Sequence, residues 1–455
     1  MNYESFVKTK SYISQTSGFD PESVNVNLFD FQRDVVKWAC RRGKAAIFAD
    51  TGLGKTAMQL SWADEVVKHT GKRVLLLAPL CVAQQTVSEG RKFGIDSVYI
   101  RGPVETKEYI HVTNYEMLKN FRPEDYAGIV LDESSILKGL QGKVRKHITE
   151  FALNIPYRLS CTATPSPNDF MELGTQSEFL GIMSQVEMLA TFFIHDGSDT
   201  SKWRLKGHGR KKFFEWLGTW AAVIRKPSDL GYKAVGYDLP PLILHEHIIE
   251  TAPIDGLFAD IALGLQERNA ARRESIQERC EKASEILDEF DIGIAWCNLN
   301  SESELIANRP DVVEITGSMD QDKKEKSIMG FTNQEISKIV TKPKIAGFGL
   351  NWQHCNKMVF IGLSDSFESY YQAIRRCWRF GQTEPVNVHI VISDREGAVL
   401  ENIKRKQRDH DRLSQEMSDI MSDITKQEIK GATVEKADYL PSDEIIIPNF
   451  MKVRA

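Results

Sequence analysis

Apolar and polar residues follow two alternating patterns along this chain. Short runs that are apolar almost throughout are separated by longer stretches in which apolar residues recur at helical spacing. The first pattern is typical of strands buried in a parallel sheet, and the second is typical of helices that cover its faces. In the first half the strand-like runs lie at residues 45–48, 73–78, 112–115, 127–131 and 157–161. This alternation predicts an α/β lobe with a parallel sheet.

The second half of the chain repeats the pattern and predicts a second α/β lobe. Its strand-like runs lie at residues 292–297, 312–315, 338–346 and 359–363. The predicted division is an N-terminal extension at 1–27, a first lobe at 28–240 with a protrusion near 190–235, a second lobe at 241–395, and a charged helical brace and tail at 396–455. The helical pattern after residue 396 is interpreted as a brace over the second lobe, a DNA contact or a solvated helix.

Composition sets the outer limits of the function. The chain has 455 residues, enough for two or three domains, and a formal net charge of −5. An acidic average does not exclude a nucleic-acid partner, because only a local basic surface is needed. The seven cysteines are never spaced as Cys-x-x-Cys, so we expect reduced thiols and no structural zinc. With no targeting segment and no membrane-spanning run, the expected compartment is the cytoplasm, that of the host if the protein is viral.

A phosphate-binding loop is predicted between the run at 45–48 and the next helical stretch. Glycines allow the loop to turn so that its backbone N–H groups face phosphate, and Lys55 would reach the β and γ phosphates of a nucleotide. The Thr56 hydroxyl would hold Mg²⁺. Ala49 stands where the commonest form of the motif has its first glycine. The nucleotide-binding residues that we predict here are Thr51, Gly52, Leu53, Gly54, Lys55 and Thr56.

Gln32 precedes this loop at the start of a helical pattern. Its amide can read an adenine edge with a donor and an acceptor. The alternative is a surface glutamine on a helix.

Two carboxylates follow the strand-like run at 127–131, at the edge where open parallel sheets bind ligands. We predict that Asp132 holds Mg²⁺ through water and that Glu133 orients and deprotonates the attacking water. The alternative is an acidic pair on a surface turn. After the next strand, Thr162 and Thr164 are predicted to sense the γ phosphate, although Thr-Pro at a strand end is also ordinary turn chemistry.

These motifs together resemble a superfamily 2 helicase-type motor, and most of all the SNF2 (Swi2/Snf2) family of DNA translocases. Lys138 stands where the acidic motif of that family carries a lysine, and the threonine motif is followed by Asn168 as in the family. Residues 239–241 are similar to the family's entry into the second lobe. Residues 372–382 match Gln-Ala-x-x-Arg-x-x-Arg-x-Gly-Gln at every fixed place. In one departure, Asp50 lies one place nearer the lysine than the family's usual acidic residue.

The resemblance implies two tandem RecA-like lobes with ATP in the cleft between them and a helical protrusion on the first lobe. Because Arg376 and Arg379 lie three residues apart, one helical face would present both as arginine fingers, with Gln372 near the attacking water. A basic helix face is the alternative. Gly347 and Gly349 resemble the motif that couples DNA to nucleotide. The compactness of the chain is similar to helicase-like proteins of bacterial viruses.

A basic run with one tryptophan interrupts the α/β pattern in the predicted protrusion. Phosphate contact by its cations and base stacking by Trp203 would suit DNA. The alternative is a solvated basic loop that Trp203 anchors to the core. The candidate DNA-binding residues are Lys202, Arg204, Arg210, Lys211 and Lys212.

The mechanism that the sequence favours is ATP-driven translocation, with ATP and Mg²⁺ as cofactors and duplex or branched DNA as a partner recognised without sequence preference. Two alternatives stay open, a strand-separating DNA or RNA helicase and a nucleotide-gated clamp on nucleic acid.

Overall fold

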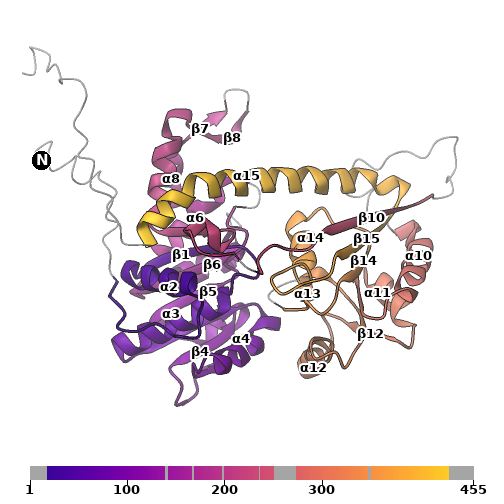
Figure 1. Cartoon of the computed structure of the whole chain (residues 1–455), viewed down its shortest axis with the longest axis horizontal. Helices are drawn as coiled ribbons and strands as arrows, with labels where there is room; N and C mark the ends of the chain where they lie inside the picture. Colours follow the sequence, from indigo (N-terminus) through magenta and orange to yellow (C-terminus); the bar gives the residue numbers. More distant parts are fainter. Residues whose placement is uncertain are drawn as a thin grey trace, which may run out of the picture.

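Two parallel β-sheets, each with helices on its faces, make up the two lobes of the structure (Figure 1). The computed structural model describes residues 18–138, 142–166, 169–196, 199–234, 236–250, 273–346 and 350–429. The predicted fold class, α/β with two tandem lobes, is confirmed.

The first lobe is built on a seven-stranded sheet in which all neighbouring strands are parallel. In sheet order its strands are β3 (Ser97–Tyr99), β4 (Ile110–Asn114), β2 (Arg73–Ala78), β5 (Tyr126–Asp132), β6 (Tyr157–Thr162), β1 (Lys44–Ala49) and β9 (Ala221–Ile224). The helices of this lobe that flank the sheet include α2 (Asp30–Arg42), α3 (Lys55–Thr70), α4 (Leu80–Lys92), α5 (Lys143–Ala152) and α6 (Leu173–Leu180). Five of these strands were predicted from their apolar runs, whereas the short edge strands β3 and β9 were not.

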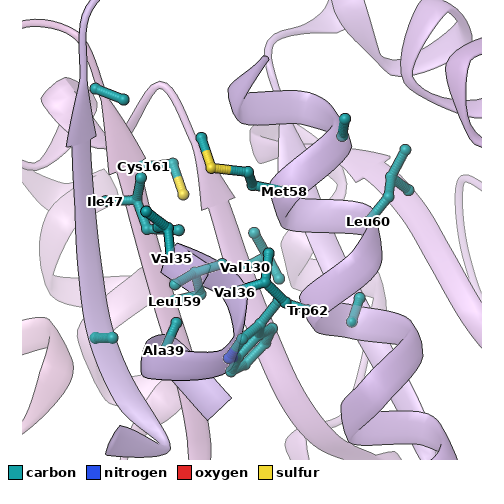
Figure 2. Packing of buried hydrophobic residues seen from close by; sticks show 14 of the residues in the cluster. Val35, Val36, Ala39, Ile47, Met58, Leu60, Trp62, Val130, Leu159 and Cys161 are labelled. Atoms are coloured by element: carbon teal, nitrogen blue, oxygen red, sulfur yellow. The ribbon is translucent and has the colours of Figure 1, made fainter. Parts of the chain in front are cut away.

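Alternate residues of these strands enter two separate hydrophobic clusters, one on each face of the sheet. On one face, Val35 and Val36 of α2 and Trp62 of α3 pack over Ile47 of β1 and Leu159 of β6 (Figure 2). Strands buried on both faces carry apolar residues throughout, which explains the continuous runs in the sequence.

The second lobe has a six-stranded parallel sheet. Its order is β10 (Leu242–Ile249), β15 (Val386–Ser393), β14 (Lys357–Ile361), β11 (Gly293–Cys297), β13 (Lys338–Thr341) and β12 (Val312–Ile315). The associated helices include α10 (Ile276–Asp288), α11 (Asn300–Ala307), α12 (Gln321–Thr332), α13 (Pro343–Ala346) and α14 (Phe367–Ile374). The predicted strand at 338–346 is wrong in its second half, because Pro343 begins a helical turn, where its fixed φ is favourable.

The protrusion of the first lobe contains a β-hairpin between helices (Figure 1). It comprises α7 (Gln185–Phe192), the antiparallel strands β7 (Phe193–Asp196) and β8 (Asp199–Leu205), and α8 (Arg210–Gly218). The predicted protrusion is therefore not helical throughout, and the basic run that we expected to be a loop is distributed over a strand, a turn and a helix. Short 3-10 helices lie at Tyr115–Asn120, Pro123–Asp125, Ser134–Lys138, Phe170–Glu172, Gly207–Gly209, Pro227–Leu230 and Asp394–Glu396.

A single long helix, α15 (Gly397–Ile429), runs across both lobes (Figure 1). Its 33 residues span about 50 Å at the α-helical rise. Near its start, Val399 and Ile403 belong to the core of the second lobe. Farther on, Met417 and Met421 belong to a core cluster of the first lobe. The helix is thus an apolar brace on both lobes.

Met421 gives a direct test of this brace, because its side chain is fully buried against the first lobe. We expect Met421→Ala to destabilise the first lobe by about 2–5 kcal/mol, through lost burial and a residual cavity. Denaturant unfolding, followed by tryptophan fluorescence, measures this loss. Gln427→Ala, at an exposed position of the same helix, serves as the control. Equal stability of the two variants would show that α15 does not brace the lobe.

Candidate active site

The predicted phosphate loop joins β1 to α3 and has the backbone that its glycines allow. Gly52 and Gly54 have φ of 90° and 76°, in the left-handed region that favours glycine. At Gly54 any other residue would strain the backbone at this φ, and its Cβ, 2.3 Å from Gln32 Nε2, would displace the Gln32 amide. Gln32 Nε2 donates to the Leu53 carbonyl at 2.9 Å, and Gln32 Oε1 accepts from the Phe29 N–H at 3.0 Å. Gln32 therefore supports the loop, and its adenine contact stays a prediction.

Lys55 lies in the first turn of α3 with its ammonium over its own loop. Nζ donates to the carbonyls of Ala49 at 2.9 Å and Asp50 at 3.3 Å. Burial lowers the pKa of Lys55, while the carboxylates of Glu133, Asp50 and Asp132 act in the opposite direction. The ammonium thus lies among three negative charges of the site.

Asp132 ends β5 and is buried. Its Oδ1 accepts from Gln59 Nε2 at 2.8 Å, and the Tyr115 hydroxyl donates to its backbone carbonyl at 2.6 Å. Burial raises the pKa of Asp132 to about 6. A buried carboxylate joined to α3 through Gln59, on the helix that also carries the Thr56 hydroxyl, supplies the oxygen donors that Mg²⁺ prefers. The residues present therefore fit a magnesium nucleotide.

Glu133 lies directly after the strand in a strained conformation, with φ of 57°. Its Oε1 accepts from Thr162 Oγ1 at 2.8 Å, from Ser135 Oγ at 3.4 Å and from Gln372 Nε2 at 3.5 Å. Thr162 Oγ1 also accepts from the Thr164 N–H at 3.1 Å. The predicted base is thus linked to the threonine motif of its own lobe and to the glutamine of the other lobe.

The two predicted arginine fingers lie side by side, although not on a helix. Helix α14 ends at Ile374, so both arginines belong to the turn that follows, and the predicted helical face is wrong. Nη1 of Arg376 and Nη1 of Arg379 donate to the same acceptor, the Leu350 carbonyl, at 3.1 and 3.0 Å. Nη2 of Arg376 donates to Gln372 Oε1 at 2.7 Å. A hydrogen-bonded path therefore runs from Arg376 through Gln372 to Glu133.

Burial shifts the pKa of both arginines. It lowers the pKa of Arg376 to about 9, and the neighbouring Arg379 guanidinium acts in the same direction. It lowers the pKa of Arg379 to about 10. Arg376 is buried and Arg379 half-buried, so this pair of guanidiniums is poised to accept negative charge.

A third arginine, Arg375, was missed by the sequence analysis. Its Nη2 lies 2.6 Å from Asp50 Oδ1 in the phosphate loop, and its Nε donates to Thr51 Oγ1 at 3.0 Å. Arg375 occupies one of the variable places of the arginine motif. The one hint in the sequence was the unusual position of Asp50, a carboxylate that can pair with an arginine.

The remaining predicted residues either lie in the protrusion or fall outside the described residues. Gly347 and Gly349 fall in the undescribed segment, and the side chain of Lys202 is not described either. In the basic run, Trp203 packs against His195 with ring centroids 3.7 Å apart, and it also contacts the first-lobe core. This is the anchoring position that was the alternative to base stacking.

The cations of this run differ in their surroundings. Arg210 forms an ion pair with Glu416 of the brace helix. Arg204, Lys211 and Lys212 are exposed.

The second lobe matches a known family. Residues 281–381 fit the model of the helicase conserved C-terminal domain. The TATA-binding protein-associated factor mot1 of Schizosaccharomyces pombe is 21% identical over 85% of this chain. This chain is similar to helicases over its second lobe and to mot1 over most of its length. It spans about a quarter of the length of mot1, 26%.

Solved structures add a comparison of folds. The helicase MrfA, solved with DNA and AMPPNP, has a TM-score of 0.53 and 15% identity, covering 84% of this chain and 50% of MrfA. The Sulfolobus solfataricus SWI2/SNF2 ATPase core in complex with dsDNA has a TM-score of 0.41 and 20% identity, covering 90% of this chain and 98% of that core. The likeness to MrfA agrees with the two-lobe fold.

The described residues contain no group of three or more His, Cys, Asp or Glu side chains arranged to hold a metal ion. Within the same ranges, every helix is too short or too polar for a membrane span.

The raised pKa of Asp132 predicts a conflict between stability and function. In the folded protein the Asp132 carboxyl stays protonated up to about pH 6, whereas its ordinary pKa is 3.8. The free energy of unfolding therefore falls as pH rises through the interval between these two pKa values. We expect Asp132→Asn to stabilise the nucleotide-free protein by about 1–3 kcal/mol at pH 8, where the buried charge is fully formed, while magnesium-dependent ATPase activity is lost.

Denaturant unfolding at pH 8 and again near pH 4 measures this effect, which should vanish at the lower pH. The asparagine Oδ1 can still accept from Gln59, so the packing is preserved. Asp423→Asn, at an exposed position of α15, is the control and should change stability little at either pH. Destabilisation by Asp132→Asn at pH 8 would refute the electrostatic argument.

Proposed function

We propose that this chain is an SNF2-like helicase of superfamily 2, a nucleic-acid-dependent ATPase that couples hydrolysis of Mg-ATP to movement along DNA, either duplex or branched. One observation carries the proposal. The Glu133 carboxylate of the first lobe lies 3.5 Å from the Gln372 amide of the second, which in turn binds Arg376. Residues suited to water activation and to charge stabilisation thus meet across the interlobe cleft.

Each of these residues has a role that its position supports. Lys55 and the loop amides bind and orient the phosphates. Asp132 and Thr56 would hold Mg²⁺, which would neutralise part of the phosphate charge. Glu133 takes a proton from water that Gln372 helps to orient. Arg376 and Arg379 stabilise the charge that develops on the γ phosphate. Because these groups come from two lobes, hydrolysis would be coupled to interlobe motion.

A cleft that Glu133 helps to line is a candidate path for a nucleic-acid strand. It has a volume of about 610 Å³ and is lined by residues of both lobes. Its three lysines, Lys138 from the first lobe and Lys324 and Lys344 from the second, stand beside three carboxylates, and Lys138 is paired with Glu368. A strand whose phosphates contact both lobes would move when the lobes move, without sequence preference. MrfA, which shares the fold, was solved with DNA.

The alternative function is strand separation, as in a DNA or RNA helicase. It would use the same ATPase residues, and only substrate behaviour distinguishes it. The third possibility is a nucleotide-gated clamp. A clamp would not need the complete set of residues for ATP hydrolysis, the lysine, the glutamate and the two arginines.

ATPase assays with duplex DNA, branched DNA, single-stranded DNA and RNA test the proposal. We expect the largest rise in kcat with duplex or branched DNA, because the proposed motion tracks a duplex backbone. A strand-displacement assay on the same substrates separates translocation from unwinding. Stimulation by single strands or RNA alone, together with displacement, would favour the alternative.

Variants of the catalytic residues should separate binding from turnover in this assay. We expect Lys55→Ala and Glu133→Gln each to lower kcat by at least about 10²-fold. Glu133→Gln should still bind ATP, because its amide preserves the shape of the site, and Lys55→Ala should bind ATP poorly. Arg379→Ala should lose the DNA-stimulated rate while duplex DNA still binds. Near-normal hydrolysis by Glu133→Gln would mean that another group is the base.

The exposed cations of the protrusion give a prediction about DNA binding. We expect neutralisation of Lys211 and Lys212 to weaken binding and to reduce the salt slope by up to about one unit for each lost phosphate contact. Binding constants measured over a salt series give the slope. Arg210→Ala is the matched comparison, since Arg210 is engaged with Glu416, and it should change the slope less. An unaltered slope in the Lys211 and Lys212 variant would leave the run as a solvated surface.

A further inference from the structure

Helix α14 contacts the first lobe at both of its ends. At its start, Glu368 forms an ion pair with Lys138, which follows the acidic motif and lines the interlobe cleft. Directly after its last residue, Arg375 reaches the phosphate loop. Between these ends, Tyr371 and Gln372 contact Asp50 and Glu133. The helix therefore spans from the cleft to the nucleotide loop.

Arg375 is the most extensively bound of these groups. Its Nη2 is 2.6 Å from Asp50 Oδ1 and 3.4 Å from the Thr51 carbonyl, and its Nε is 3.0 Å from Thr51 Oγ1. The guanidinium lies over the rings of Tyr371 and Trp378, with its carbon 5.6 and 5.1 Å from the centroids. Arg375 is 4% exposed. A planar fork fixed on two neighbouring loop residues and two rings has little freedom to move.

The charges support the same conclusion. Burial acts to raise the pKa of Asp50, but the Arg375 guanidinium, the Thr51 amide and Lys55 outweigh it, so the pKa lies below its ordinary value. Asp50 is thus ionised at neutral pH and needs a cation. Lys55 is a poor candidate for that cation during turnover, because the proposed function directs it to phosphate.

Arg375 also differs from the two fingers in its partners. Arg376 and Arg379 bind the Leu350 carbonyl of their own lobe, whereas Arg375 binds the loop of the other lobe. Phe380 also lies close to the phosphate loop. A Cβ added to Gly52 would lie only 2.8 Å from the backbone nitrogen and the Cβ of Phe380. The turn that carries the fingers is therefore held against the phosphate loop by protein groups on both sides.

We propose that Arg375 is a positioning residue that docks the second lobe on the phosphate loop through Asp50 and Thr51. This contact sets the lobe arrangement in which Arg376 and Arg379 face the nucleotide. The role rests on the proposed ATPase function, but the docking itself requires no ATP. It makes a distinct prediction for the nucleotide-free protein.

Interlobe distance in the nucleotide-free protein is the first test. Dyes attached to p-azidophenylalanine at Lys92 of α4 and Lys323 of α12, both exposed, report this distance by energy transfer. We expect lower transfer in Arg375→Ala and in Asp50→Asn than in the wild type. Arg405→Ala, at an exposed position of α15, is the matched arginine control and should match the wild type. Unchanged transfer in both test variants would overturn the proposal.

DNA-stimulated turnover is the second test. We expect Arg375→Ala and Asp50→Asn each to lower kcat by about 10-fold or more, and the double variant to be no worse than the poorer single variant within about 3-fold. Arg375→Lys retains the charge but cannot bind Asp50 and Thr51 together, so its kcat should lie between those of the wild type and Arg375→Ala. Its residual activity also confirms that the protein is folded. Multiplication of the two single losses in the double variant would show independent roles and refute the docking contact.

The two tests separate the proposals. A wild-type protein without ATPase activity on any nucleic acid would contradict the proposed function. The energy-transfer measurement would still decide whether Arg375 docks the lobes.

Discussion

The arrangement of the site depends on charges that are buried where the two lobes meet. Asp132, Arg375 and Arg376 are each less than a tenth exposed, and every one belongs to the facing surfaces of the lobes. Burying an isolated charge is costly, so such groups persist only where an opposite charge or a hydrogen bond compensates. Asp132 and Arg376 are hydrogen-bonded within their own lobes, to Gln59 and to Gln372, whereas Arg375 of the second lobe is paired with Asp50 of the first. The Arg375–Asp50 pair therefore exists only while the two lobes are in contact.

This constraint explains why hydrogen bonds cross the lobes in a connected set. Thr162 fixes the Glu133 carboxylate from within the first lobe, and Gln372 meets the same oxygen from the second. Gln372 can do so because its other amide atom binds Arg376. A change in the position of α14 would thus alter the base, the water-orienting amide and one finger together. Under the proposed function, this shared hydrogen bonding would couple turnover to lobe motion.

Much of the fold could be predicted from sequence, because buried parallel strands and a phosphate loop have strong local patterns. The apolar runs gave most strands, and the spacing of Lys55 and Asp132 located the edge of the sheet where they meet. The pattern could not show that α14 ends before Arg376, since a turn and a helix both allow arginines three residues apart. It also could not show that Trp203 packs on His195, or that Gln32 supports Leu53, because these contacts depend on tertiary placement. Arg375 was missed for the same reason: its partner lies 325 residues away.

Helix α15 adds a restraint that the two-lobe motif alone does not have. The helix is anchored in both hydrophobic cores, and its His410 packs against Phe367 and Tyr371 of α14, with ring centroids 5.3 and 5.2 Å apart. Helix α14 therefore has the phosphate loop on one side and the brace on another. A rod packed on both lobes cannot follow a wide opening unless it bends or loses contacts with one core. Under the proposed function, any lobe motion would therefore have to change the contacts of α14 with the phosphate loop or with the brace.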